Sequence, residues 1–98
     1  MAIKKQYLKS KPICKVTFTL LAKEAKKVAV VGDFNDWDTK VSQLRKLKNG
    51  TFKGILDLEK EKTYEFRYVV DGIYLNDDQA DSYVWNDYAS TENSVLEL

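Results

Sequence analysis

Apolar and polar residues alternate along most of this chain, and this pattern limits its possible folds more than any other feature. In residues 13–21 the apolar Cys14, Val16, Phe18 and Leu20 are separated by lysine and threonine. A period of two is typical of a strand with one buried face. Because no segment shows the helical period of 3.6 residues, the sequence predicts an all-β protein.

Turn signals divide the chain into further strands. Asn49-Gly50 separates residues 41–48 from residues 51–58, and Asp71-Gly72 separates residues 63–70 from residues 73–75. Both dipeptides favour tight hairpin turns, since their residues tolerate positive φ. The nearly all-apolar residues 28–34 predict a central strand, and residues 94–98 a last one. Residues 77–92 are polar and irregular in pattern. About seven strands predict an antiparallel β-sandwich of immunoglobulin-like size.

The length of 98 residues favours one domain with one compact core. We expect this domain to span residues 12–98, after a basic N-terminal extension of residues 1–11. The chain start lacks the long apolar stretch of a secretory signal, so we expect a cytoplasmic protein without membrane contact. The single cysteine, Cys14, cannot form an internal disulfide, which agrees with a reducing compartment.

The charge is unevenly distributed, although the net charge is only +1. Residues 1–53 carry thirteen Lys/Arg and four Asp/Glu, whereas residues 54–98 carry three and eleven. A basic half could attract nucleic acid. We favour the alternative in which strands of both halves interleave and mix these charges, since no arginine cluster or glycine-aromatic RNA signature accompanies the lysines.

The residue inventory argues against an enzyme. The chain has no histidine, the commonest general base and metal ligand near neutral pH. We expect Cys14 to face inward as a small hydrophobe. The carboxylates of residues 76–81, NDDQAD, suggest a glycosidase acid pair or a calcium site, but the stretch lacks the loop spacing of a calcium hand. We interpret it as a solvated acidic loop, and we predict no metal and no cofactor.

A binding module is the remaining class, and Trp37 is its first candidate residue. This tryptophan lies in VVGDFNDWDTK, among turn-forming residues that favour the surface. It either folds onto the core or presents a flat apolar surface to a ligand. A sugar ring needs such a surface, with a few hydrogen-bonding groups around it. Strand alternation places Arg67 on the face opposite Tyr64, Phe66 and Tyr68, where it could meet solvent.

The motifs VAVVGDFNDWD, YEFRYVVDGIYLNDD and ENSVLEL also resemble a known family. Over residues 28–98 the chain resembles carbohydrate-binding module family 48, which includes the N-terminal early-set domains of isoamylases and branching enzymes. It is similar to the glycogen-binding domain of AMP-activated protein kinase β subunits. The resemblance implies binding of α-1,4-glucans such as glycogen, maltooligosaccharides and cyclodextrin, and a glycogen-metabolising enzyme as a candidate partner.

The resemblance also implies a set of binding residues. Two aromatic rings would stack on the glucan, and a basic residue, a threonine and an asparagine would surround them: Trp37, Tyr74, Arg67, Thr91 and Asn93. The chain departs from kinase β subunits at Ala89, where they carry a leucine, and at Tyr74, where they carry a tryptophan. The main alternative is a protein-interaction sandwich that has lost sugar binding. Trp85 either extends the platform or covers a sheet edge, and Tyr83 and Tyr88 are interpreted as packing residues.

Overall fold

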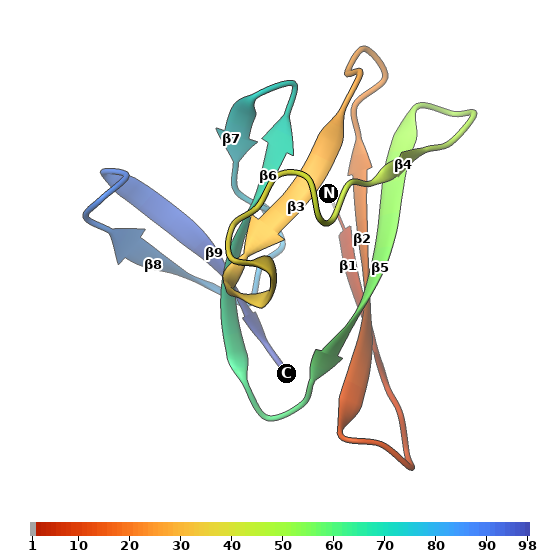
Figure 1. Cartoon of the computed structure of the whole chain (residues 1–98), viewed down its shortest axis with the longest axis vertical. Helices are drawn as coiled ribbons and strands as arrows, with labels where there is room; N and C mark the ends of the chain where they lie inside the picture. The colour runs from red at the N-terminus through yellow and green to blue at the C-terminus, as the bar shows by residue number, and fades with distance from the viewer. Residues whose placement is uncertain (1) are drawn as a thin grey trace.

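Residues 2–98 are described by a computed structural model, in which two antiparallel sheets pack face to face (Figure 1). Sheet A has the order β1-β2-β5-β4 and sheet B the order β3-β6-β9-β8, with β7 pairing to β6. The elements are β1 (Ala2–Tyr7), β2 (Ile13–Leu21), β3 (Val28–Gly32), the 3₁₀ helix η1 (Asp33–Asn35), β4 (Arg45–Lys46), β5 (Thr51–Glu59), β6 (Thr63–Val70), β7 (Ile73–Leu75), β8 (Ser82–Asn86) and β9 (Thr91–Glu97). This confirms the all-β sandwich, with nine strands in the described residues. No helix in this part of the chain is long and apolar enough to cross a membrane.

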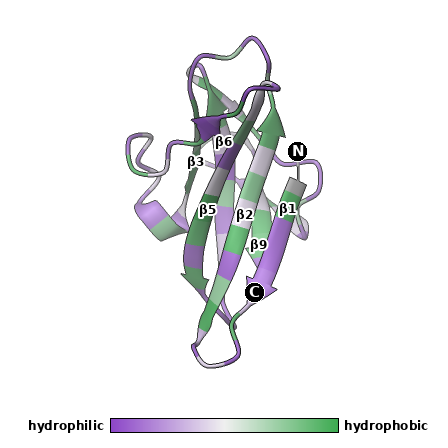
Figure 2. Cartoon of the chain, turned by 90° about the vertical axis from the view of Figure 1, so that its right-hand side faces the viewer, coloured by the Kyte–Doolittle hydropathy of each residue, from purple (hydrophilic) through white to green (hydrophobic). Residues whose placement is uncertain are grey.

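The core lies between the sheets and follows the alternation of the sequence. Burial along β2 alternates residue by residue, and Figure 2 shows the matching alternation of hydropathy on the strands of sheet A. Phe18 from β2 meets Phe66 from β6 with ring centroids 5.6 Å apart at a tilt of 63°. Such edge-to-face pairs add to the stability gained by burying apolar area. Cys14 is fully buried in the same cluster, as expected of a small hydrophobe.

The segment predicted as a strand over residues 41–48 forms only the two-residue strand β4. The residues before β4 bond to β3 of sheet B and not to sheet A. Val30 N donates to Ser42 O at 3.0 Å, and Leu44 N donates to Val28 O at 2.8 Å. The segment therefore connects both sheets along one edge. Since each half of it bonds to a different sheet, it cannot remain one straight strand.

Two strands were not predicted from the sequence. β1 pairs with β2 over its whole length, from Ala2 opposite Thr19 to Tyr7 opposite Cys14. β8 pairs with β9, which begins at Thr91, three residues before the predicted strand. Both are edge strands. Neither AIKKQY of β1 nor SYVWN of β8 alternates apolar and polar residues, so neither carries the period-two signal of a strand with one buried face. The interpretation of residues 77–92 as irregular is wrong for this reason.

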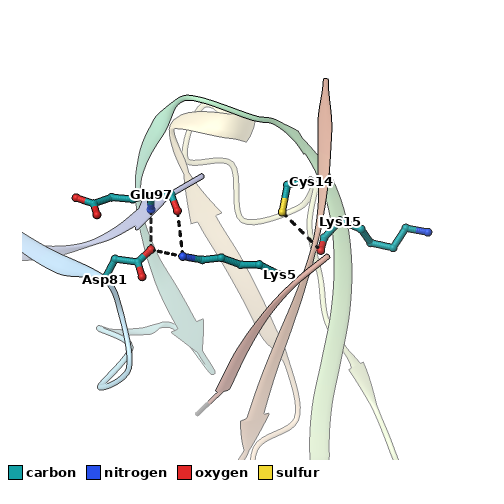
Figure 3. A network of polar contacts seen from close by, with 5 residues as sticks. All are labelled: Lys5, Cys14, Lys15, Asp81 and Glu97. Atoms are coloured by element: carbon teal, nitrogen blue, oxygen red, sulfur yellow. Dashed lines mark hydrogen bonds and ion pairs between the residues drawn. The ribbon is translucent and has the colours of Figure 1, made fainter. Parts of the chain in front are cut away.

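Lys5 joins the two sheets. From β1 its Nζ donates to Asp81 Oδ2 at 2.6 Å and to the carbonyl of Glu97 at 3.0 Å (Figure 3). Asp81 Oδ2 also accepts the Glu97 amide at 2.7 Å. This lysine therefore links β1 to β9 and to the loop before β8.

The predicted hairpin turns are present, but a third glycine acts differently. Gly50 and Gly72 have φ of 86° and 87°, which other residues adopt only with strain. Gly32, in contrast, has an extended φ of 180°, which any residue can adopt. A side chain there would collide with the carbonyl of Glu65 and with Phe66. Gly32 is needed because β6 approaches it closely.

The charge asymmetry of the sequence persists in space. The strands of sheet A carry six basic and two acidic residues, and those of sheet B one and three. Only β3 brings the basic half into sheet B. The prediction that strands of the two halves interleave and mix their charges is therefore wrong.

Candidate functional site

The outer face of sheet B, which points away from sheet A, carries a pocket of about 400 Å³. Its lining comes from the turn after β3, from β6, β7 and β9, and from the β8–β9 hairpin: Trp37, Arg67, Tyr74, Asn86, Tyr88, Ala89 and Asn93. Four of the five residues predicted for a site are thus brought together, although 56 positions separate the first from the last.

Strand register places these side chains on one face. In β6, Tyr68 belongs to the core, so its neighbours Arg67 and Val69 point outward. Tyr74 lies opposite Val69 in β7, and Asn93 follows the same outward alternation in β9, where its neighbour Ser94 pairs with Phe66. Because side chains alternate along every strand, this pairing places Arg67, Tyr74 and Asn93 together on the outer face of sheet B.

Arg67 is the floor of the pocket and is only 8% exposed. Its Nε donates to Asn93 Oδ1 at 2.8 Å, and Asn93 Nδ2 donates to Glu65 Oε1 at 3.0 Å. The Nη2 atom of Arg67 is buried and has no hydrogen-bond partner, the only such side-chain atom found in residues 2–98. Buried donors are nearly always paired, so this charged donor lacks a partner from the described part of the chain, in a residue that lines the pocket.

The turn that presents Trp37 is held by Asn35. The Asn35 side chain accepts the Gly32 amide at 3.0 Å and donates to Val30 O at 3.0 Å and Ser42 Oγ at 3.1 Å. After it, Asp36 and Trp37 both adopt the left-handed conformation, with φ of 54° and 57°. A bulky residue at positive φ is strained, and such strain is concentrated at functional sites.

Asp33 orients the indole ring. Its Oδ1 accepts Trp37 Nε1 at 3.3 Å, and its Oδ2 accepts the Glu65 amide of β6 at 2.9 Å. The ring is half-buried and does not belong to the core cluster. Of the two alternatives for Trp37, the structure therefore supports a surface held in place beside the pocket.

Three aromatic residues border the pocket, one of which the sequence analysis missed. Tyr74 is 50% exposed and Tyr88 is 99% exposed, so the interpretation of Tyr88 as a packing residue is wrong. Asn86 Oδ1 accepts the amides of Tyr88 and Ala89 at 3.0 and 3.3 Å, which shapes their turn. An aromatic residue in a polar turn was the signal used for Trp37, and NDY in residues 86–88 carries the same signal.

Thr91 and Trp85 lie outside this pocket. Thr91 pairs with Asn86 at the start of β9 but does not line the cavity. Trp85 pairs with Glu92, so it lies on the sheet face opposite Asn93 and cannot extend the platform. It is 59% exposed on the edge strand β8.

The acidic loop is only partly solvated. Asp77 is fully buried, and its Oδ2 accepts the Tyr68 hydroxyl at 2.7 Å. Burial, followed by this hydrogen bond, raises the pKa of Tyr68 far above its usual range, so the phenol stays protonated. Asp77 thus fastens the loop to the core, contrary to the solvated-loop interpretation. Within residues 2–98 no three His, Cys, Asp or Glu side chains are grouped so as to hold a metal ion.

Comparison with known proteins identifies one family. Residues 6–89 match the family described as carbohydrate-binding module 48 (isoamylase N-terminal domain). The match starts before the resemblance noted in the sequence and ends before β9, so it includes Trp37, Arg67 and Tyr74 but not Asn93. No curated protein matches the chain.

Proposed function

Since this chain belongs to the carbohydrate-binding module 48 family, a family of non-catalytic modules, we propose that its pocket binds α-1,4-glucans such as glycogen, starch-like chains and cyclodextrin. The observation that carries this proposal is the unpaired Nη2 of Arg67 at the floor of a pocket bordered by aromatic rings. In this proposal Trp37 and Tyr74 stack on glucose units, and Arg67 and Asn93 bond to their hydroxyls. Thr91 is assigned a peripheral contact with a longer chain.

The chemistry of glucose fits these groups. Each glucose ring has an apolar face of C–H groups and a rim of hydroxyls, so it needs a flat ring and a few directed donors and acceptors. Arg67 donates several bonds from one plane, and Asn93 both donates and accepts. We also assign Tyr88, which is almost fully exposed, a contact with a second glucose unit. We place the protein in the cytoplasm beside its glucan, with a glycogen-metabolising enzyme as candidate partner.

A second candidate function is protein interaction with loss of sugar binding. Exposed apolar side chains on the sheet face opposite Tyr74 and Asn93 favour it: Ile73 and Trp85 are 65% and 59% exposed. Sugar binding and protein binding would use different surfaces, so variants in the pocket separate the two functions.

Affinity electrophoresis in glycogen tests the proposal, with β-cyclodextrin as competitor and DNA as a control. We expect glycogen to retard the wild-type protein and Trp37→Ala to abolish retardation, since losing a stacked ring costs about 1–3 kcal/mol of binding. Trp85→Ala is the matched control, because it removes the tryptophan on the opposite face. No retardation of the wild-type protein, or equal retardation of all three, would contradict the proposal. Affinity for the neutral sugar should barely change with salt, whereas DNA binding would weaken steeply.

A further inference from the structure

A second pocket lies beside the first on the outer face of sheet B and is larger, at about 740 Å³. Tyr74 lines both pockets. The apolar part of the second pocket includes Ala29 and Val69, and three lysines stand around it: Lys26, Lys27 and Lys40.

Strand register shows that the two pockets are continuous. Ala29 of β3 pairs with Val69 of β6, which pairs with Tyr74 of β7, and this row lies in the second pocket. Arg67, in the first pocket, is the next outward residue of β6. A chain lying on Trp37 and Arg67 therefore needs only to pass Tyr74 to reach the lysines.

The second pocket differs from the first in its charge. The ammonium groups of Lys26, Lys27 and Lys40 have no hydrogen-bond or ion-pair partner in the described part of the chain. The one carboxylate of the pocket, Asp71, already accepts the amides of Lys27 and Lys26 at 2.8 and 3.0 Å. Three lysines against one carboxylate leave the pocket positive, although the charge of Lys26 also acts on Asp71. A positive pocket favours an anion and offers no advantage to a neutral sugar.

We propose that this lysine pocket binds a phosphate monoester carried on the glucan, next to the neutral glucose units held by Trp37 and Arg67. A phosphate monoester is compact and carries close to two negative charges at neutral pH, so several ammonium groups can meet it together. Tyr74, with both pockets at its sides, would stack on the sugar unit that joins them. This inference rests on the proposed glucan binding, which it extends to phosphorylated chains.

Calorimetry with three probes tests the inference: maltoheptaose, maltoheptaose bearing one phosphate monoester, and inorganic phosphate. The variant is Lys26→Gln with Lys27→Gln and Lys40→Gln. Its matched control is Lys4→Gln with Lys15→Gln and Lys53→Gln. These control residues pair across the outer face of sheet A, with Thr17, Asp57 and Thr19. The two variants lose equal charge, so a difference between them reports position.

We expect the wild-type protein and the control to bind the phosphorylated chain about tenfold more tightly than the neutral chain, as three exposed ion pairs would give. The Lys26, Lys27 and Lys40 variant should bind both chains equally, and high salt should remove the preference of the wild-type protein. Inorganic phosphate alone should bind far more weakly than the phosphorylated chain, because it lacks the stacking groups.

The outcomes separate this inference from the proposed function. If the wild-type protein binds both chains equally, or if the control variant also loses the preference, the lysine pocket is not a phosphate site, while glucan binding stands. If only the phosphorylated chain binds, the proposal of a phosphate site in the lysine pocket is supported and the proposal that the protein binds neutral glucans is refuted. If neither chain binds, both proposals are wrong.

Discussion

The change from Arg67 to Met most directly tests the reasoning about the candidate site. Methionine keeps an unbranched apolar stem and removes the guanidinium. A hydrogen bond from a charged donor contributes about 1.5–3 kcal/mol, so glucan affinity should fall about ten- to a hundredfold. The measurement is calorimetric titration with maltoheptaose.

The stability of the free protein should change little, because two effects oppose each other. Removing the guanidinium removes a buried donor, Nη2, whose lack of a partner costs about 1–3 kcal/mol. It also leaves Asn93 Oδ1 without the bond it accepts at 2.8 Å, at a cost of similar size. We therefore expect the free energy of unfolding in urea to stay within about 2 kcal/mol of the wild-type value.

Arg45→Met is the matched control, since Arg45 is exposed on β4 of sheet A. It should change neither quantity. If Arg67→Met lowers the free energy of unfolding by more than about 3 kcal/mol and leaves glucan affinity unchanged, the guanidinium is a structural group and the unpaired donor carries no information about a ligand.

Three further outcomes are expected. Tyr74→Phe should keep most of the glucan affinity and Tyr74→Trp should hold or raise it by about 0.5–1 kcal/mol, whereas Tyr74→Ala should lower it; equal affinity in calorimetry across the series would remove Tyr74 from the site. Gly32→Ala should lower the free energy of unfolding in urea by about 1–3 kcal/mol, because its Cβ would collide with β6; an unchanged value would refute the close approach. Hydrogen bonds from the Lys27 and Lys26 amides lower the pKa of Asp71, so its stabilising effect is complete above the unfolded pKa of about 3.9 and is lost as the pH falls through the lower folded value. The stability difference between wild type and Asp71→Asn in urea unfolding should therefore shrink below about pH 4, and a difference that grows there would reverse the sign of this argument.

Local sequence determined the strands and turns whose signals are complete within a few residues. The alternation in β2 and β6 predicted which large side chains enter the core, because a strand turns successive residues to opposite faces. Asn49-Gly50 and Asp71-Gly72 predicted their turns, because the positive φ of Gly50 and Gly72 is a local property of the backbone. The Trp37 turn and the family resemblance were likewise readable from the residues themselves.

Edge strands and shared segments depended on the tertiary structure. β1 is lysine-rich and gains its order from pairing with β2, while residues 42–46 divide their hydrogen bonds between two sheets. The sequence of β1 and of residues 42–46 does not predict these pairings, because the hydrogen-bond partners lie on other strands. The persistence of charge asymmetry between the sheets was decided in the same way, by which strands pair.

The same distinction between local sequence and tertiary structure applies to the candidate site. The sequence alone determined the kinds of residue available for a sugar site, Trp37, Arg67 and Asn93 among them. Only the tertiary structure decided that Asn93 occupies one nitrogen of Arg67 and leaves Nη2 unpaired, that Tyr88 is exposed at the pocket while Trp85 lies on the other face, and that a lysine pocket adjoins Tyr74. The physical reason is that strand pairing sets both the face and the neighbours of each side chain, and this pairing joins residues distant in the sequence.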